Sequence, residues 1–169
     1  MEKQVILLNG PSSSGKSTLA QQLQALILET RGERYEIVSI DSFLHMTAQD
    51  VIYEDDVFGI SQELCSAARD ALRTADGVII DHVITSRRIF EQLTSALCTW
   101  KLWCICVTCP PEVLRAREAA RGNRCPGSAE ASAAYLYPKE GYDLTVDTNS
   151  MPAGECTEYF CGFCFNDDP

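Results

Sequence analysis

Short apolar runs rich in β-branched residues recur along the chain, and longer segments with apolar residues at helical spacing separate them. Strands that alternate with helices predict βαβ units and a parallel sheet. Several runs are apolar at nearly every position, which is typical of strands covered on both faces. We therefore predict an α/β fold with helices on both faces of a parallel sheet. The expected strands are Val5–Leu8, Tyr35–Ile40, Gly77–Val83, Lys101–Cys109 and Leu144–Asp147.

The segments between these runs carry helix signals. Apolar residues from Leu19 to Ile27 repeat at helical spacing, and Ser86 and Pro110 are residue types that favour helix starts. The sequence has no internal repeat, low-complexity tract or linker, so we expect one domain over residues 1–169. The predicted helices are Lys16–Glu29, Ser61–Thr74, Ser86–Leu97, Pro110–Arg121, Ser128–Leu136 and Glu155–Phe163.

The first apolar run leads directly into a loop that satisfies the pattern G-x-x-x-x-G-K-[ST] in full. Its glycines let the backbone curl so that N–H groups point at phosphate oxygens, and the following helix presents its positive end. We expect Lys16 to reach the β- and γ-phosphates of ATP, and the Ser17 hydroxyl to coordinate Mg²⁺. A chance turn before a helix is the alternative. The nucleotide-binding residues predicted from the loop are Gly10, Pro11, Ser12, Ser13, Ser14, Gly15, Lys16, Ser17 and Thr18.

Two aspartates stand where apolar runs end. Asp41 follows Ile37–Ile40, and Asp81 follows Val78–Ile80. In open parallel sheets the ligand lies outside the carboxyl ends of the strands, so these acids are candidates for chemistry. We predict Asp41 as the base that accepts the proton of an attacking hydroxyl and Asp81 as the acid that supports Mg²⁺. The alternative for each is a helix-capping aspartate after a strand.

Arginines cluster in one segment of an otherwise acidic chain. Arg117 and Arg121 are four residues apart and share a helical face. Such clustering indicates neutralisation of charge on a transferring phosphoryl group, and a guanidinium can also stack on adenine. A solvated basic face paired with Glu112 and Glu118 is the alternative. The cluster comprises Arg115, Arg117, Arg121 and Arg124.

Glycines bracket the turn that follows this cluster. Gly122 and Gly127 are suited to hinge a small lid at about residues 117–137, which would exclude water and limit wasteful ATP hydrolysis. We count Arg121 and Arg124 of this lid, with Lys16 and Asp41, among the predicted catalytic residues.

Charge and composition restrict the partners. The 169 residues carry a formal net charge of −10, which repels nucleic acid and anionic lipid. The N-terminus lacks the pattern of a signal peptide, and no stretch approaches a membrane span. We therefore expect a cytoplasmic protein that contacts neither nucleic acid nor membrane. Its nine cysteines are expected to be free thiols in that compartment, and the sequence is compatible with a homo-oligomer.

Taken together, these motifs resemble chloramphenicol phosphotransferase-like proteins, a branch of the P-loop kinases. The sequence differs from the family pattern in two places. Family members carry a second acid where this chain has His82, and the segment Phe43–Phe58, which is expected to shape the acceptor pocket, matches poorly. The motifs that carry the resemblance are Leu8–Ser17, Ile40–Ser42, Gly77–Val83, Arg117–Arg124, Glu140–Asp143 and Val146–Thr148.

The resemblance implies a P-loop NTPase fold with a five-stranded parallel sheet and ATP-dependent 3-O-phosphotransferase activity, with antibiotic resistance as one candidate role. It implies that Asp41 is the base for the acceptor hydroxyl and that Arg117, Arg121 and Arg124 belong to the nucleotide and lid region. It also implies that Asp147 and Thr148 lie near the adenine.

The predicted function is transfer of the γ-phosphate of ATP to a hydroxyl of a small molecule, with ATP and Mg²⁺ as cofactors. Within this class, the alternative is a kinase of a nucleoside, a nucleotide sugar or another metabolite. A different class is a regulatory nucleotide-binding protein, either a GTP switch or a catalytically silent ATP binder. The sequence lacks the Asn-Lys-x-Asp signature of guanine recognition, which argues against the GTP switch.

Overall fold

The computed structural model describes residues 2–44 and 53–165. Its centre is a five-stranded sheet in which every pair of neighbouring strands is parallel, in the order β2-β3-β1-β4-β5. The parallel α/β fold predicted from the sequence is thereby confirmed. The strands are β1 (Gln4–Asn9), β2 (Tyr35–Ser39), β3 (Gly77–His82), β4 (Lys101–Thr108) and β5 (Leu144–Asp147).

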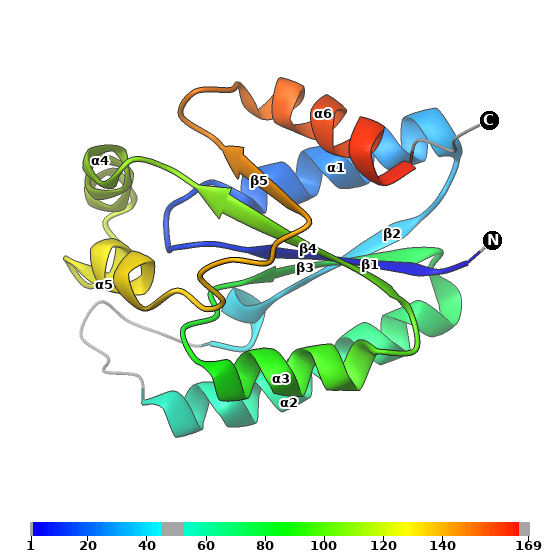
Figure 1. Cartoon of the computed structure of the whole chain (residues 1–169), viewed down its shortest axis with the longest axis horizontal. Coiled ribbons are helices and arrows are strands. Elements are labelled where there is room, and N and C mark those ends of the chain that lie inside the picture. The colour runs from blue at the N-terminus through cyan, green and yellow to red at the C-terminus, as the bar shows by residue number, and fades with distance from the viewer. Residues whose placement is uncertain (1, 45–52, 166–169) are drawn as a thin grey trace.

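Helices cover the sheet in two layers (Figure 1). Helices α1 (Lys16–Arg31) and α6 (Ala153–Phe165) pack on one face. The opposite face is covered by α2 (Glu54–Thr74) and α3 (Arg87–Leu97). Beyond the carboxyl ends of the strands lie two short helices, which are α4 (Pro111–Arg121) and α5 (Ser128–Tyr135).

Each strand contributes alternate side chains to two separate cores. On β1, Ile6 and Leu8 belong to the core under α1 and α6, whereas Val5 and Leu7 belong to the core over α2 and α3. All four are fully buried. This double coverage is the physical reason why the strands are continuously apolar in sequence.

One helix begins earlier than its sequence pattern indicates. We predict a start at Ser61, but α2 begins at Glu54. Its first turn is acidic, which the positive end of a helix favours, and the Asp56 carboxylate accepts a hydrogen bond from the amide of Tyr53 at 3.4 Å. The acidic first turn and the glycine at position 59 weaken the helix signal ahead of Ser61. Most of the remaining part of the Phe43–Phe58 segment, which we expect to shape the acceptor pocket, falls in residues 45–52, outside the described ranges.

The cysteines are free thiols. Most are buried or half-buried, and burial raises the pKa of Cys104 and of Cys161 to about 11 in each case. Thiols of this kind pack as small hydrophobic groups and react slowly. Among the described residues, we find no helix with the length and apolar character needed to span a bilayer.

Candidate active site

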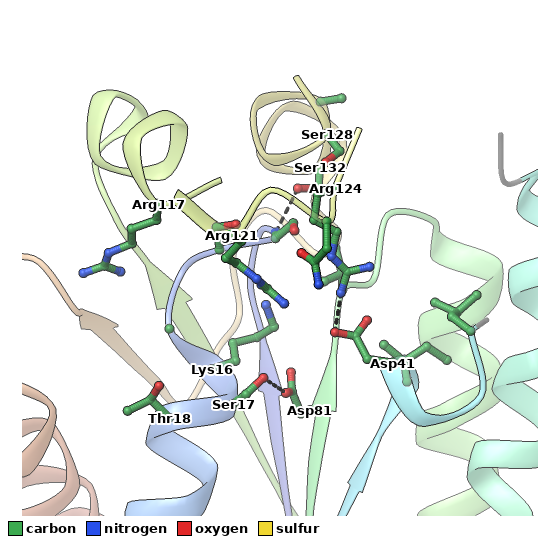
Figure 2. Close-up of a pocket in the computed structure, with 18 of the residues that line it drawn as sticks. Lys16, Ser17, Thr18, Asp41, Asp81, Arg117, Arg121, Arg124, Ser128 and Ser132 are labelled. Carbon is green, nitrogen blue, oxygen red and sulfur yellow. Dashed lines mark hydrogen bonds and ion pairs between the residues drawn. The ribbon is translucent and has the colours of Figure 1, made fainter. Parts of the chain in front are cut away.

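A cavity of about 830 Å³ lies beyond the carboxyl ends of the strands, where ligands bind in open α/β sheets. The phosphate-binding loop forms its floor, and the ends of β2 and β3 form one side. The segment 117–137, which we call the lid, covers it from above (Figure 2). The cavity therefore brings together the three regions to which the sequence analysis assigned chemistry.

The loop between β1 and α1 has the curled backbone that phosphate binding requires. A Cβ on Gly10 would lie 2.1 Å from the carbonyl oxygen of Val107, so a larger residue would collide with β4. Gly15 has φ of +97°, a left-handed conformation that favours glycine. The Lys16 ammonium is buried and donates to the Pro11 carbonyl oxygen at 2.8 Å. Burial lowers the pKa of Lys16, and the charges of Asp81 and Asp41 oppose that shift.

Ser17 and Asp81 lie together at the base of the cavity. The Ser17 hydroxyl donates to the Asp81 carboxylate at 2.6 Å, and Asp81 is buried. Strand β3 neighbours β1 in register, with Asp81 opposite Leu8, so the acid is held next to the loop that follows β1. A hydroxyl and a carboxylate are the hard oxygen ligands that Mg²⁺ prefers, so these two residues fit such an ion.

Asp41 faces the cavity from the short helix η1 (Ile40–Ser42) that follows β2. Its carboxylate forms a hydrogen-bonded ion pair with the guanidinium of Arg124, which comes from the lid. The Asp41 side chain remains 41% exposed and that of Arg124 only 16%. Figure 2 shows Arg121 directed into the same space, toward Lys16. The four predicted catalytic residues therefore border one cavity.

The lid is held together by a buried carboxylate. Glu118 of α4 accepts hydrogen bonds from the amides of Gly127 and Ala129 and from the Ser128 hydroxyl, at 2.7–2.8 Å. Burial alone would raise the pKa of Glu118, but these hydrogen bonds outweigh it and lower the pKa. Glu118 therefore joins α4 to the start of α5, a role different from the basic-face pairing considered above.

Arg117 and Thr148 contact the phosphate-binding loop at the carbonyl oxygen of Ser14. The Arg117 guanidinium donates to the Thr148 hydroxyl at 2.9 Å, and that hydroxyl donates to the Ser14 carbonyl oxygen at 2.6 Å. Both residues reach the cavity lining, whereas Asp147 is not among the described residues that form it. The Asp147 carboxylate accepts from the amide of Asn149 at 2.8 Å. Its expected contact with adenine stays a prediction.

Sequence reasoning missed a lid residue that touches the loop. Ser132 lies on α5, and its hydroxyl accepts a hydrogen bond from the amide of Ser12 at 2.9 Å (Figure 2). The two residues are 120 positions apart, so no local pattern could join them.

Almost the whole chain matches one protein family. A sequence model of the family described as chloramphenicol phosphotransferase-like protein matches residues 3–162. The chain belongs to this family. It is 28% identical to a candidate O-phosphotransferase of Mycobacterium tuberculosis (strain H37Rv) over 180 residues, which span 91% of the chain and 79% of the relative.

Solved structures of P-loop kinases share the fold. The APS kinase CysC of Mycobacterium tuberculosis, in complex with AMPPNP and APS, superposes with a TM-score of 0.72 at 15% identity, covering 96% of this chain and 97% of that one. A sugar kinase from Janibacter sp. HTCC2649 gives 0.70 at 18% identity over 95% and 94%. A gluconokinase from Sinorhizobium meliloti 1021 superposes with a TM-score of 0.66 at 19% identity, covering 92% of this chain and 87% of that one. Family and fold together make the chain a P-loop small-molecule kinase.

Proposed function

We propose that this chain moves the γ-phosphate of ATP to a hydroxyl group of a small molecule and that Asp41 is the base. The observation that carries the proposal is the position of Asp41 on the cavity that the phosphate-binding loop floors. A kinase of this type needs a donor phosphate held in place and a carboxylate on the acceptor side. The phosphate-binding loop and the Asp41 carboxylate line the same cavity.

The donor side is supplied by the loop and its helix. The amides between Gly10 and Ser17 would surround the phosphates, and Lys16 would leave the Pro11 carbonyl to contact the β- and γ-phosphates. Ser17 and Asp81 would hold Mg²⁺, which screens phosphate charge when bound. Arg117 and Thr148 would keep the loop curled through their contacts at Ser14.

On the acceptor side, proton removal is the task of Asp41. As the acceptor oxygen attacks the γ-phosphorus, its proton passes to the carboxylate of Asp41, and ADP leaves in line. Arg121 and Arg124 neutralise the charge on the moving phosphoryl group. Arg124 must then turn from Asp41 toward the phosphate, a short movement because both groups border the same cavity.

The acceptor wall is largely apolar. Ile40, Leu44, Val57 and Val83 line it beside Asp41, with Tyr135 from the lid. This lining favours an apolar alcohol, and the family favours chloramphenicol phosphorylated on its 3-hydroxyl, with antibiotic resistance as the role. A sugar or nucleoside acceptor is the alternative, because P-loop kinase folds serve many acceptors. We place the protein in the cytoplasm, where ATP is present and thiols stay reduced.

The proposal is tested with labelled ATP, Mg²⁺ and a panel of alcohols that contains chloramphenicol, nucleosides and sugars. We expect one class of alcohol to become labelled. Asp41→Asn should lower kcat by about 10²–10⁴-fold, as expected for loss of a general base, with ATP affinity changed only a few-fold. Asp70→Asn, at an exposed aspartate on α2, is the matched control. Wild-type transfer rates in Asp41→Asn would refute the assignment.

A further inference from the structure

Asn9 is buried and fully engaged, yet the proposed chemistry does not use it. It is the last residue of β1, directly before Gly10, and its side chain is inaccessible to solvent. Its amide nitrogen donates to the Tyr137 carbonyl oxygen at 2.9 Å and to the Tyr142 hydroxyl at 2.8 Å. Its amide oxygen accepts from the backbone amide of Ile84 at 2.9 Å. Three hydrogen bonds thus meet on one side chain next to the phosphate-binding loop.

The partners belong to two segments far apart in sequence. Ile84 lies in the connection from β3 to α3, between Val83 and Thr85, which both line the cavity. Tyr137 and Tyr142 lie in the connection from lid helix α5 to β5. The two connections also bond directly, because the Tyr137 amide donates to the Ile84 carbonyl oxygen at 2.9 Å. Asn9 therefore ties the acceptor wall and the lid attachment to the strand that carries the loop.

We infer that Asn9 is a positioning residue for phosphoryl transfer, an inference that rests on the proposed function. Through Ile84 it sets the acceptor wall relative to the bound phosphates. Through Tyr137 and Tyr142 it fixes the C-terminal end of the lid. Arg121 and Arg124 belong to the same lid, nearer its N-terminal end. Small displacements of reacting groups cost large factors in rate, and a loosely attached lid admits water.

The chemistry of the site requires an asparagine. Two donors and one acceptor are needed on one short planar group, and a carboxylate would supply no donor. An aliphatic side chain of similar size would leave the Tyr137 carbonyl and the Ile84 amide without their partner. Tyr142 is secured further because its hydroxyl donates to the Pro138 carbonyl oxygen at 2.8 Å.

The test compares two variants with a control on the same strand. Asn9→Leu removes the three hydrogen bonds of the Asn9 side chain, which together we call the Asn9 junction. Tyr142→Phe removes the two hydrogen bonds of the Tyr142 hydroxyl, to Asn9 and to the Pro138 carbonyl oxygen, with little change of shape. Gln4→Leu is the control, because Gln4 accepts from the Trp103 indole at 2.8 Å at the opposite end of β1. The measurements are kcat and KM for ATP and acceptor, the ATP hydrolysed per acceptor phosphorylated, and the melting temperature.

We expect both junction variants to lower the kcat of transfer, Asn9→Leu by about tenfold. They should also raise the share of ATP that is hydrolysed instead of being used to phosphorylate the acceptor, while the KM for ATP changes little. Gln4→Leu should lower the melting temperature by a similar amount but leave the hydrolysed share of ATP at the wild-type value. A hydrolysed share of ATP that is unchanged in Tyr142→Phe would overturn the inference. If Asn9→Leu does not fold, Tyr142→Phe alone provides the test.

A second readout separates this inference from the proposed function. In hydrogen exchange, AMPPNP should protect lid amides in the wild type and in Gln4→Leu but protect them less in Tyr142→Phe. If the wild type phosphorylates no alcohol, the proposed function fails. The hydrogen-exchange measurement still tests whether Asn9 positions the lid. Equal lid protection in all three proteins would overturn the positioning role.

Discussion

His82 makes the stability of this protein depend on pH below neutrality. It is the last residue of β3 and is fully buried. Burial lowers its pKa from 6.5 to about 4; the Val83 backbone and Asp41 oppose the shift, and Lys16 adds to it. Between these pH values the unfolded chain binds a proton at His82 that the folded chain does not. Lowering the pH through this window therefore favours unfolding.

The size of the effect follows from the shift. One pKa unit corresponds to about 1.4 kcal/mol, so His82 should cost the folded state about 2 kcal/mol at pH 5 and almost nothing at pH 7. The cost would rise to about 3 kcal/mol at pH 4 and a little further below it, where carboxylates also titrate. Comparison of pH 7 with pH 5 is therefore the cleaner experiment.

The assay is urea unfolding of the wild type and of His82→Leu at both pH values. The wild type should lose about 2 kcal/mol more unfolding free energy between pH 7 and pH 5 than the variant does. The chain has two histidines, and the other, His45, is present in both proteins, so its contribution cancels. Equal losses in both proteins would refute the reasoning, as would an NMR titration of His82 near its ordinary pKa.

Three further changes probe the loop and the lid. Gly10→Ala should lower the free energy of unfolding by about 1–3 kcal/mol, because its Cβ would meet the Val107 carbonyl oxygen. Gly162→Ala is the control, because Gly162 has open space around it, and it should not lower the melting temperature. Lys16→Met should weaken ATP binding in calorimetry by about 10–100-fold, and unchanged affinity would contradict the role of Lys16. Glu118→Gln should loosen the start of α5 and speed proteolysis of the lid, because the three donors use both carboxylate oxygens. A glutamine amide has one acceptor oxygen, so its NH2 group would face at least one of these donors.

Much of the site could be read from short segments. The loop from Gly10 to Ser17 has a local pattern whose backbone geometry depends on its own glycines, and Asp41 and Asp81 follow runs that are recognisable as strands. Because carboxyl ends of parallel strands lie at one edge of a sheet, these residues had to come near one another.

The functions of the more distant contacts could not be read in this way. Residues 124 and 41, 132 and 12, and 137 and 9 meet across 83, 120 and 128 positions of sequence, and the residue types alone do not indicate these pairs. Asn9 falls within the Leu8–Ser17 motif, but its three partners come from connections that are distant in sequence and meet it only in the folded chain.

The α/β class, the phosphate-binding loop and the acids beside it follow from the amino-acid sequence, because hydrophobic period, glycine geometry and strand ends are properties of neighbouring residues. The strand order, the pairing of the lid with Asp41 and the Asn9 junction emerge only in the folded chain. Those features depend on how the layers pack, and packing joins groups whose separation along the chain carries no signal.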